Sequence, residues 1–188
     1  MEEGKYYHIF NRGNNRENIF KEKDNYRYFL EKYEKYLVGH VETFAYCLMP
    51  NHFHFLIKVK EQSQSIKPEK FKASNLRPIE KAFRDFFISY AKSINKKYNR
   101  VGSLFQYKFK RKEVATEGYL KRLVIYIHNN PVEACLSNKL SDWNYSSYNS
   151  IEKKQNSGFL NCEALEWFED DENFEYCHKK NVKIESDW

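Results

Sequence analysis

Hydrophobic and polar residues alternate along four short stretches of the chain, and this spacing is typical of strands whose two faces differ. The alternation predicts a strand that begins at Tyr6 and ends at the turn 11–15, and strands over Thr43–Met49, His52–Lys60 and Leu104–Val114. Pro50 and Asn51 separate the two middle stretches. We therefore expect either a hairpin or one strand interrupted by a bulge there.

Apolar residues recur every three or four positions along longer stretches, which predicts helices. The expected helices lie between Asp24 and Gly39, from Pro78 to about Tyr98, from Glu117 after the cap Thr116 to about Asn129, and within the acidic segment Leu160–His178. Pro131 is expected to end the third helix, because proline disfavours helical geometry in the residue before it. Residues 61–75 are polar and lack periodicity, so they predict a loop.

The order of these elements is strand, helix, strand, strand, helix, strand, helix. This order predicts an α+β fold of ferredoxin-like or RRM-like shape, in which helices pack on one face of an antiparallel sheet. We expect one domain over residues 1–150 and a C-terminal helical tail over 151–188, whose aromatic residues dock on the domain.

The composition adds a basic and aromatic character. The chain has 188 residues, a formal net charge of +6 and 18% aromatic residues, which favours nucleic acid as a partner, although lysine-rich solvated surfaces are common. The four cysteines show no metal-binding spacing and are interpreted as reduced. Neither a signal peptide nor a membrane span is evident, so we expect a cytoplasmic protein.

One stretch, CLMPNHFHFLIK (residues 47–58), places two histidines inside an apolar strand. His52 and His54 are two residues apart and therefore lie on the same face, with alpha-carbons about 6.6 Å apart, while Phe53 and Phe55 take the other face. Two imidazoles so placed can bind one metal ion. From the spacing alone, a pair bonded to backbone carbonyls or to each other is an alternative of at least equal weight.

Helix three, in the stretch KRLVIYIHNNPV, contains candidates for a third ligand. Tyr126 and Asn130 are four residues apart, so they share the arc expected to pack toward the sheet, whereas His128 lies nearly opposite. A buried core tyrosine is the alternative reading of Tyr126. Asn51 is either a residue that orients His52 or only the turn residue after Pro50.

Four stretches together resemble the single-tyrosine HUH transposases of the insertion-sequence 200-like superfamily, and among them the REP-associated tyrosine transposases. The stretches are YHIFNRGNN, CLMPNHFHFLIK, GSLFQYKFK, and YIHNNPVEA followed by WNYSSY, and they span about Tyr6 to Tyr148. The combination of MPNHxH with YIHxNPV in that order is more specific than either motif alone. The resemblance implies an HUH endonuclease fold.

The resemblance also implies the chemistry. In such enzymes His52 and His54 would hold Mg²⁺ or Mn²⁺, and Tyr126 would be the nucleophile that forms a 5′-phosphotyrosine link while it cleaves and rejoins single-stranded hairpin DNA. A phenol with a pKa near 10 is a weak nucleophile, so a cation that offsets phosphate charge suits it. Asn130 is our choice for the third ligand, because it lies one turn beyond Tyr126.

Basic residues predict where the DNA lies. We expect a phosphate track along the strand 104–114, and base contacts from the first turn; the residues are Lys108, Lys110, Arg111, Lys112, Arg12, Asn14 and Arg16. Solvated strand and turn surfaces are the alternative. The chain departs from the family at Gln106-Tyr107-Lys108, where a glycine-arginine pair often follows the glutamine, so the bidentate phosphate contact of an arginine is lost there.

Two other classes of function compete with a metal-dependent tyrosine transposase. The first is a domesticated, catalytically weak protein that binds hairpin DNA, and the second is an RNA-binding module of ferredoxin-like shape. The intact His52, His54 and Tyr126 argue against the former, and the latter leaves the paired histidines unexplained. We expect a monomer or a homodimer that acts on single-stranded or hairpin DNA.

Overall fold

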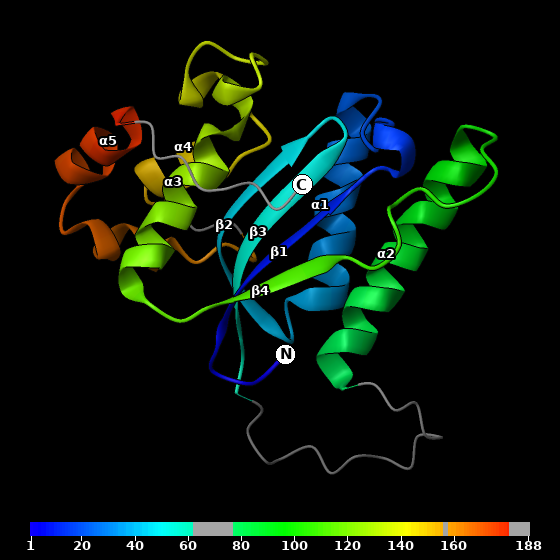
Figure 1. Cartoon of the computed structure of the whole chain (residues 1–188), viewed down its shortest axis with the longest axis horizontal. Coiled ribbons are helices and arrows are strands. Elements are labelled where there is room, and N and C mark those ends of the chain that lie inside the picture. Colours follow the sequence, from blue (N-terminus) through cyan, green and yellow to red (C-terminus); the bar gives the residue numbers. More distant parts are fainter. Residues whose placement is uncertain (62–76, 156–157, 181–188) are drawn as a thin grey trace.

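The computed structural model describes residues 1–61, 77–155 and 158–180. Its elements, in chain order, are β1 (Tyr6–Arg12), η1 (Asn14–Arg16), α1 (Lys23–Leu37), β2 (Val41–Met49), β3 (His52–Val59), α2 (Pro78–Lys97), β4 (Lys110–Val114), α3 (Glu117–Glu133), η2 (Leu140–Asp142), α4 (Tyr148–Glu152), η3 (Cys162–Phe168) and α5 (Asp171–Lys179). Figure 1 shows α1 and α2 on one side of the sheet and α3, α4 and α5 on the other. The loop expected over residues 61–75 lies almost entirely outside the described residues.

The four strands form an antiparallel sheet in the order β2-β3-β1-β4. β2 and β3 make a hairpin across Pro50 and Asn51, which resolves the choice between a hairpin and a bulge. Together with the helices, this sheet confirms the predicted α+β class and the ferredoxin-like order of elements.

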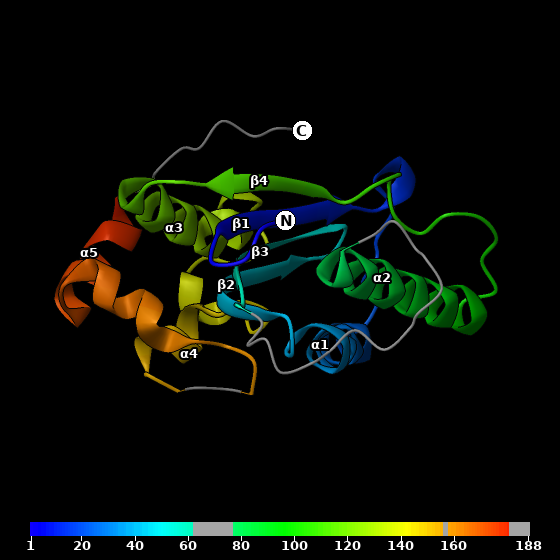
Figure 2. The same cartoon turned by 90° about the horizontal axis from the view of Figure 1, so that it is seen from below.

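Aromatic side chains fill the space between one sheet face and helices α1 and α2. Phe53 and Phe55 alternate with the histidines and point to this side, where Phe55 stacks on Tyr33 of α1 with ring centroids 4.4 Å apart. Phe29 of α1 lies 5.2 Å from Phe53 and 4.9 Å from Phe86 of α2. This apolar layer leaves the opposite face of β3 to the histidines. Figure 2 shows the sheet between α3 on one side and α1 and α2 on the other.

Helix α3 packs on the histidine face, so helices cover both faces of the sheet. The expected packing of helices on one face describes α1 and α2. The Thr116 side chain caps α3 by accepting a hydrogen bond from the Tyr119 N–H, as the sequence predicts. The prediction that Pro131 ends the helix is wrong, because α3 continues to Glu133. A proline this close to the end removes only one helical N–H, and the chain turns instead at Cys135, whose φ is +54°.

Two other boundaries differ from the prediction. The strand expected over Leu104–Val114 is confined to Lys110–Val114, and before it only Phe105 makes an isolated bridge, to Gly13. The single helix expected within Leu160–His178 is divided into η3 and α5, with Glu169 between them at a φ of +73°. Local periodicity continued through both places, but tertiary contacts set the ends of the elements.

The C-terminal elements pack on the sheet and on α3. Trp167 of η3 stacks on Phe44 of β2 at 5.1 Å, and Phe174 of α5 stacks on Tyr148 at 5.6 Å. These contacts agree with the expected docking of the tail aromatics, while the domain boundary at residue 150 stays a prediction. Among the described helices, none combines the length and the apolar composition that crossing a membrane requires.

Candidate functional site

The floor of the site is a group of histidines on one face of two neighbouring strands. In the antiparallel register Arg12 faces His52 and Phe10 faces His54, so His8 lies diagonally across from His54 on the same face. His8 Nε2 and His54 Nδ1 are 2.9 Å apart, and their rings are stacked. The alternation of β1 and β3 thus brings three histidines together, with His54 only 1% exposed.

Helix α3 brings Tyr126 and Asn130 over this floor. The Tyr126 ring stands nearly perpendicular to the ring of His54, with centroids 5.4 Å apart, and it lies 6.3 Å from the ring of His8. Asn130, one turn later, is hydrogen-bonded to the side chain of His52 and donates from Nδ2 to the Tyr126 carbonyl at 2.7 Å. The predicted meeting of His52, His54, Tyr126 and Asn130 therefore occurs in the structure.

Burial keeps the two strand histidines neutral. Desolvation, with a smaller contribution from the charge of Arg12, lowers the pKa of His52 to about 4, although the hydrogen bond with Asn130 opposes this shift. Desolvation and the neighbouring imidazoles hold the pKa of His54 well below its usual range. At neutral pH each imidazole therefore has one protonated nitrogen and one nitrogen with a lone pair, which is the form that binds a metal.

The hydrogen-bond partners indicate which nitrogen carries the proton. The Asn51 side-chain oxygen lies 2.6 Å from His52 Nδ1, and an amide oxygen only accepts, so His52 donates from Nδ1. His54 has His8 at the corresponding Nδ1 position. Asn51 and His8 therefore fix the orientation of the two imidazole rings, and metal-binding histidines commonly have partners of this kind.

The donors present can hold a divalent cation. The described residues contain no group of three His, Cys, Asp or Glu side chains suited to a metal ion, so the donor set here is two imidazoles with the Asn130 amide. Imidazole favours transition metals, amide and water oxygens suit Mn²⁺ and Mg²⁺, and a site with so few protein ligands leaves positions for water and phosphate.

The turn after β1 is held against this site by close backbone contacts. The Gly13 N–H donates to the Asn51 carbonyl at 2.8 Å, and a Cβ on Gly13 would lie 2.0 Å from the Glu17 carbonyl oxygen, so only glycine fits. Arg12 is half-buried, and its pKa is lowered by burial and by Arg16, while attraction to Tyr126 opposes that shift. Arg12 therefore lies within electrostatic reach of Tyr126.

The other predicted DNA-binding residues do not all lie on one face of the sheet. Lys110 faces Phe10 and Lys112 faces His8 in the β1–β4 register, so both lysines share the histidine face, and Asn14 and Arg16 are exposed in the turn. Arg111 faces Ile9 on the opposite side and pairs with Glu80 of α2 at 2.9 Å. Lys108 lies outside the strand, at a φ of +60°. The single basic face predicted for 104–114 is thus wrong for Arg111.

Sequence reasoning gave no role to His8, although it occurs in the quoted stretch YHIFNRGNN. One signal was available: His8, like His52 and His54, is a polar residue inside an otherwise apolar strand. Only the register between β1 and β3, however, brings it next to His54.

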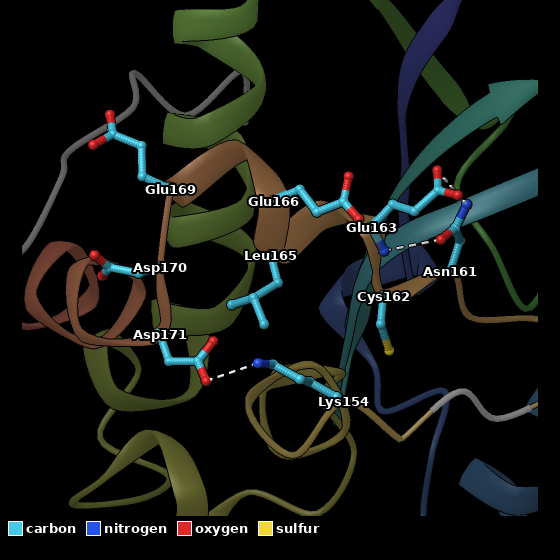
Figure 3. A pocket seen from close by; sticks show the side chains of 9 residues that line it. All are labelled: Lys154, Asn161, Cys162, Glu163, Leu165, Glu166, Glu169, Asp170 and Asp171. Carbon is cyan, nitrogen blue, oxygen red and sulfur yellow. Dashed lines mark hydrogen bonds and ion pairs between the residues drawn. The ribbon is translucent and has the colours of Figure 1, made fainter.

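A pocket elsewhere on the molecule is unsuited to DNA. It lies among α4, η3 and α5 and is lined mainly by acidic residues, among them Glu163, Glu166 and Asp170 (Figure 3). Its Lys154 is paired with Asp171 at 2.9 Å. Such a surface repels phosphate, so the polar face beside Tyr126 is the better candidate for a nucleic-acid site.

Comparisons with known proteins show what the whole chain is similar to. No protein-family model matches the chain. A Haemophilus influenzae protein, provisionally named as a REP-associated tyrosine transposase, is 28% identical over 109 residues, which cover 57% of this chain and 58% of that protein. The chain thus spans little more than half the length of this curated relative.

A solved structure, described as a REP-associated tyrosine transposase bound to a REP hairpin, has a similar fold. Its TM-score is 0.62 at 14% sequence identity, and the match covers 85% of this chain and 87% of that one. This likeness concerns the fold, and the curated relative adds likeness in sequence. In both respects, this chain is similar to REP-associated tyrosine transposases.

Proposed function

We propose that this protein is a metal-dependent tyrosine transposase, which cleaves and rejoins single-stranded or hairpin DNA through Tyr126. The observation that carries the proposal is the meeting of two neutral, buried histidines of β3 with Tyr126 and Asn130 of α3. A core tyrosine alone would not require three polar partners at one point of the sheet.

The proposed reaction uses residues already described. Tyr126 Oη attacks the scissile phosphorus, the P–O3′ bond breaks, and the phenol proton is lost while the departing 3′ oxygen takes up a proton. The products are a 5′-phosphotyrosine and a free 3′-hydroxyl, so attack by a 3′-hydroxyl restores the phosphodiester without ATP. Mg²⁺ or Mn²⁺, held by His52, His54 and Asn130, would polarise the phosphate and offset its developing charge.

The positive side chains on the same sheet face support DNA as the substrate. Arg12, Lys110 and Lys112 lie on the face that carries the histidines, so they can contact phosphates on either side of the cleaved one. Tyr126 is only 7% exposed. A single strand can bring its backbone down to such a recessed group more easily than a continuous duplex, which favours hairpin ends and flanking single strands.

The test is covalent capture on a labelled hairpin oligonucleotide that carries single-stranded flanks. The unmodified protein with Mg²⁺ or Mn²⁺ is expected to give a denaturation-resistant protein–DNA band, which disappears in excess chelator and in Tyr126→Phe, because that variant lacks only the attacking oxygen. Tyr119→Phe is the matched control, since Tyr119 lies on the same helix about 10 Å away along its axis.

A band that persists in Tyr126→Phe would refute the assigned nucleophile. Hairpin binding without any band in the unmodified protein would instead favour the DNA-binding protein that has lost cleavage. Cleavage unchanged by chelator would remove the metal from the proposal.

A further inference from the structure

The segment between α2 and β4 carries a tyrosine that the proposed reaction does not use. Tyr107 is 90% exposed, which is unusual for an aromatic ring in a chain whose other aromatics are mostly packed. It also directly follows Gln106, at the point where the chain departs from the pattern given above. Its exposure therefore calls for a physical reason of its own.

The segment around Tyr107 is anchored on both sides. Phe105 is buried, with its ring 5.4 Å from the ring of Phe87, and Phe109 packs 5.1 Å from Phe83 and 5.3 Å from Phe87. The residues two positions before and after Tyr107 are thus held by packing, Phe105 in the core and Phe109 against it. The exposed ring is presented from a held backbone, so little conformational entropy would be lost when it binds a partner.

The exposed tip of this segment, formed by Tyr107 and Lys108, also carries a positive charge. Lys108 has a φ of +60°, a left-handed conformation that lysine rarely adopts, and its Nζ lies 5.5 Å from the centroid of the Tyr107 ring. An exposed ring and an ammonium group therefore share one tip, and this combination suits a base together with its phosphate.

Backbone hydrogen bonds tie this tip to the candidate site. The Gln106 N–H donates to the Arg12 carbonyl, and the Asn14 N–H donates to the Leu104 carbonyl, each at 2.9 Å. Arg12 in turn faces His52 across the β1–β3 pair. The exposed tyrosine therefore follows directly on a residue bonded to the strand end beside the histidines.

We propose that Tyr107 is a stacking platform for an unpaired base of the single strand that flanks the cleaved phosphate, with Lys108 and Arg16 contacting the neighbouring backbone. This inference rests on the proposed function, since it assigns a substrate contact of that same site. Every base has a π face, so the contact selects unpaired nucleotides over duplex without reading a particular sequence.

The charges favour nucleic acid over a protein as the occupant. Lys108 is exposed beside the ring, Arg16 is exposed in the turn after β1, and Lys110 follows on the histidine face of β4. A row of cations beside an aromatic ring is the arrangement that tracks a single-stranded backbone. A second copy of this basic chain would bring like charges together, so that occupant becomes an outcome of the test.

The experiment compares two hairpin oligonucleotides, one blunt and one with a short unpaired flank, in equilibrium binding. Tyr107→Ala is expected to weaken binding of the flanked hairpin by about 5- to 150-fold, the range for loss of one base–aromatic stack, and to leave the blunt hairpin unaffected. Tyr107→Phe keeps a ring and should retain the affinity. Val101→Ala is the matched control, because Val101 is 98% exposed in the same segment.

A direct readout comes from 2-aminopurine, a fluorescent adenine analogue whose emission falls on stacking, placed at each flank position in turn. One position should be quenched by the unmodified protein and by Tyr107→Phe, and not by Tyr107→Ala. Equal quenching and affinity in Tyr107→Ala would overturn the inference, as would a change in oligomeric state in place of a change in affinity.

The outcomes separate this inference from the proposed function. Absence of the covalent band in the unmodified protein would reject the reaction, while ring-dependent quenching would still establish the binding surface. A normal band in Tyr107→Ala, with flank affinity unchanged, would reject the surface alone.

Discussion

His8 illustrates how a single side chain acquires significance from its neighbours. It is 6% exposed, stacks on Phe10 at 4.5 Å and is hydrogen-bonded to His54 at 2.9 Å. A buried imidazole needs partners for both ring nitrogens, and His8 serves one of the nitrogens of His54. It thereby orients the ring of a residue that we propose as a metal ligand.

His8→Ala is therefore expected to reduce Mn²⁺ affinity by about 10- to 100-fold, the usual effect of removing an orienting partner. Electron paramagnetic resonance of free Mn²⁺ in a titration would measure it without requiring DNA cleavage. His8→Gln, whose side-chain oxygen can still accept a hydrogen bond, should recover most of the affinity. Equal Mn²⁺ affinity in His8→Ala and the unmodified protein would show that His54 needs no such partner.

Strand β4 shows how alternation divides neighbouring cations between two surfaces. Lys112 faces His8 on the candidate DNA face, while Arg111 points to the other side and pairs with Glu80. A strand that reads simply as basic in the sequence therefore contributes to two different environments, because successive side chains project in opposite directions.

Lys112→Ala is expected to weaken DNA binding similarly for all sequences and to lower the slope of log affinity against log salt by about 1, as for one phosphate contact. Arg111→Ala provides the matched control from the same strand and should leave the salt slope unchanged. Fluorescence anisotropy at several salt concentrations measures both. A slope that changes in Arg111→Ala and not in Lys112→Ala would reverse the assignment of the faces.

The C-terminal segment is joined to the rest of the protein by a chain of buried hydrogen bonds. His178 of α5 donates from Nδ1 to the Phe174 carbonyl at 2.7 Å, so its neutral form accepts at Nε2 from His128 Nδ1, 2.9 Å away. His128 Nε2 lies 2.8 Å from Ser147 Oγ, which accepts from the Tyr46 N–H. The back of α3 is thus connected to both α5 and β2.

His178→Ala is expected to lower the free energy of unfolding by about 2–4 kcal/mol, because it opens a cavity and leaves the buried His128 Nδ1 unsatisfied. Urea denaturation should still show one transition, at a lower midpoint. Tyr176→Ala on the same helix is the control and should have little effect, since Tyr176 is 54% exposed. An unchanged main transition in His178→Ala would indicate that residues 151–180 unfold independently of the domain.

Periodicity predicted the elements well where local and tertiary preferences agree. The stripe from Ile79 to Ile94 faces the core in α2, which begins at Pro78 as expected. Periodicity gave a wrong prediction at Leu104–Phe109, where alternating aromatics resemble a strand but Phe105 and Phe109 each pack against α2. Alternation specifies which side chains are apolar, whereas hydrogen bonding to a neighbouring strand decides whether the backbone is a strand.

The sequence alone determined which side chains share a face, because the periods of a strand and of a helix are properties of the local backbone. It therefore placed His52 with His54 and Tyr126 with Asn130. Only the tertiary structure decided that these two pairs meet, that His8 joins them across β1 and β3, and that Tyr107 projects while Phe105 is buried and Phe109 packs against the core. Those relations depend on strand register and helix docking between distant segments, which no local pattern encodes.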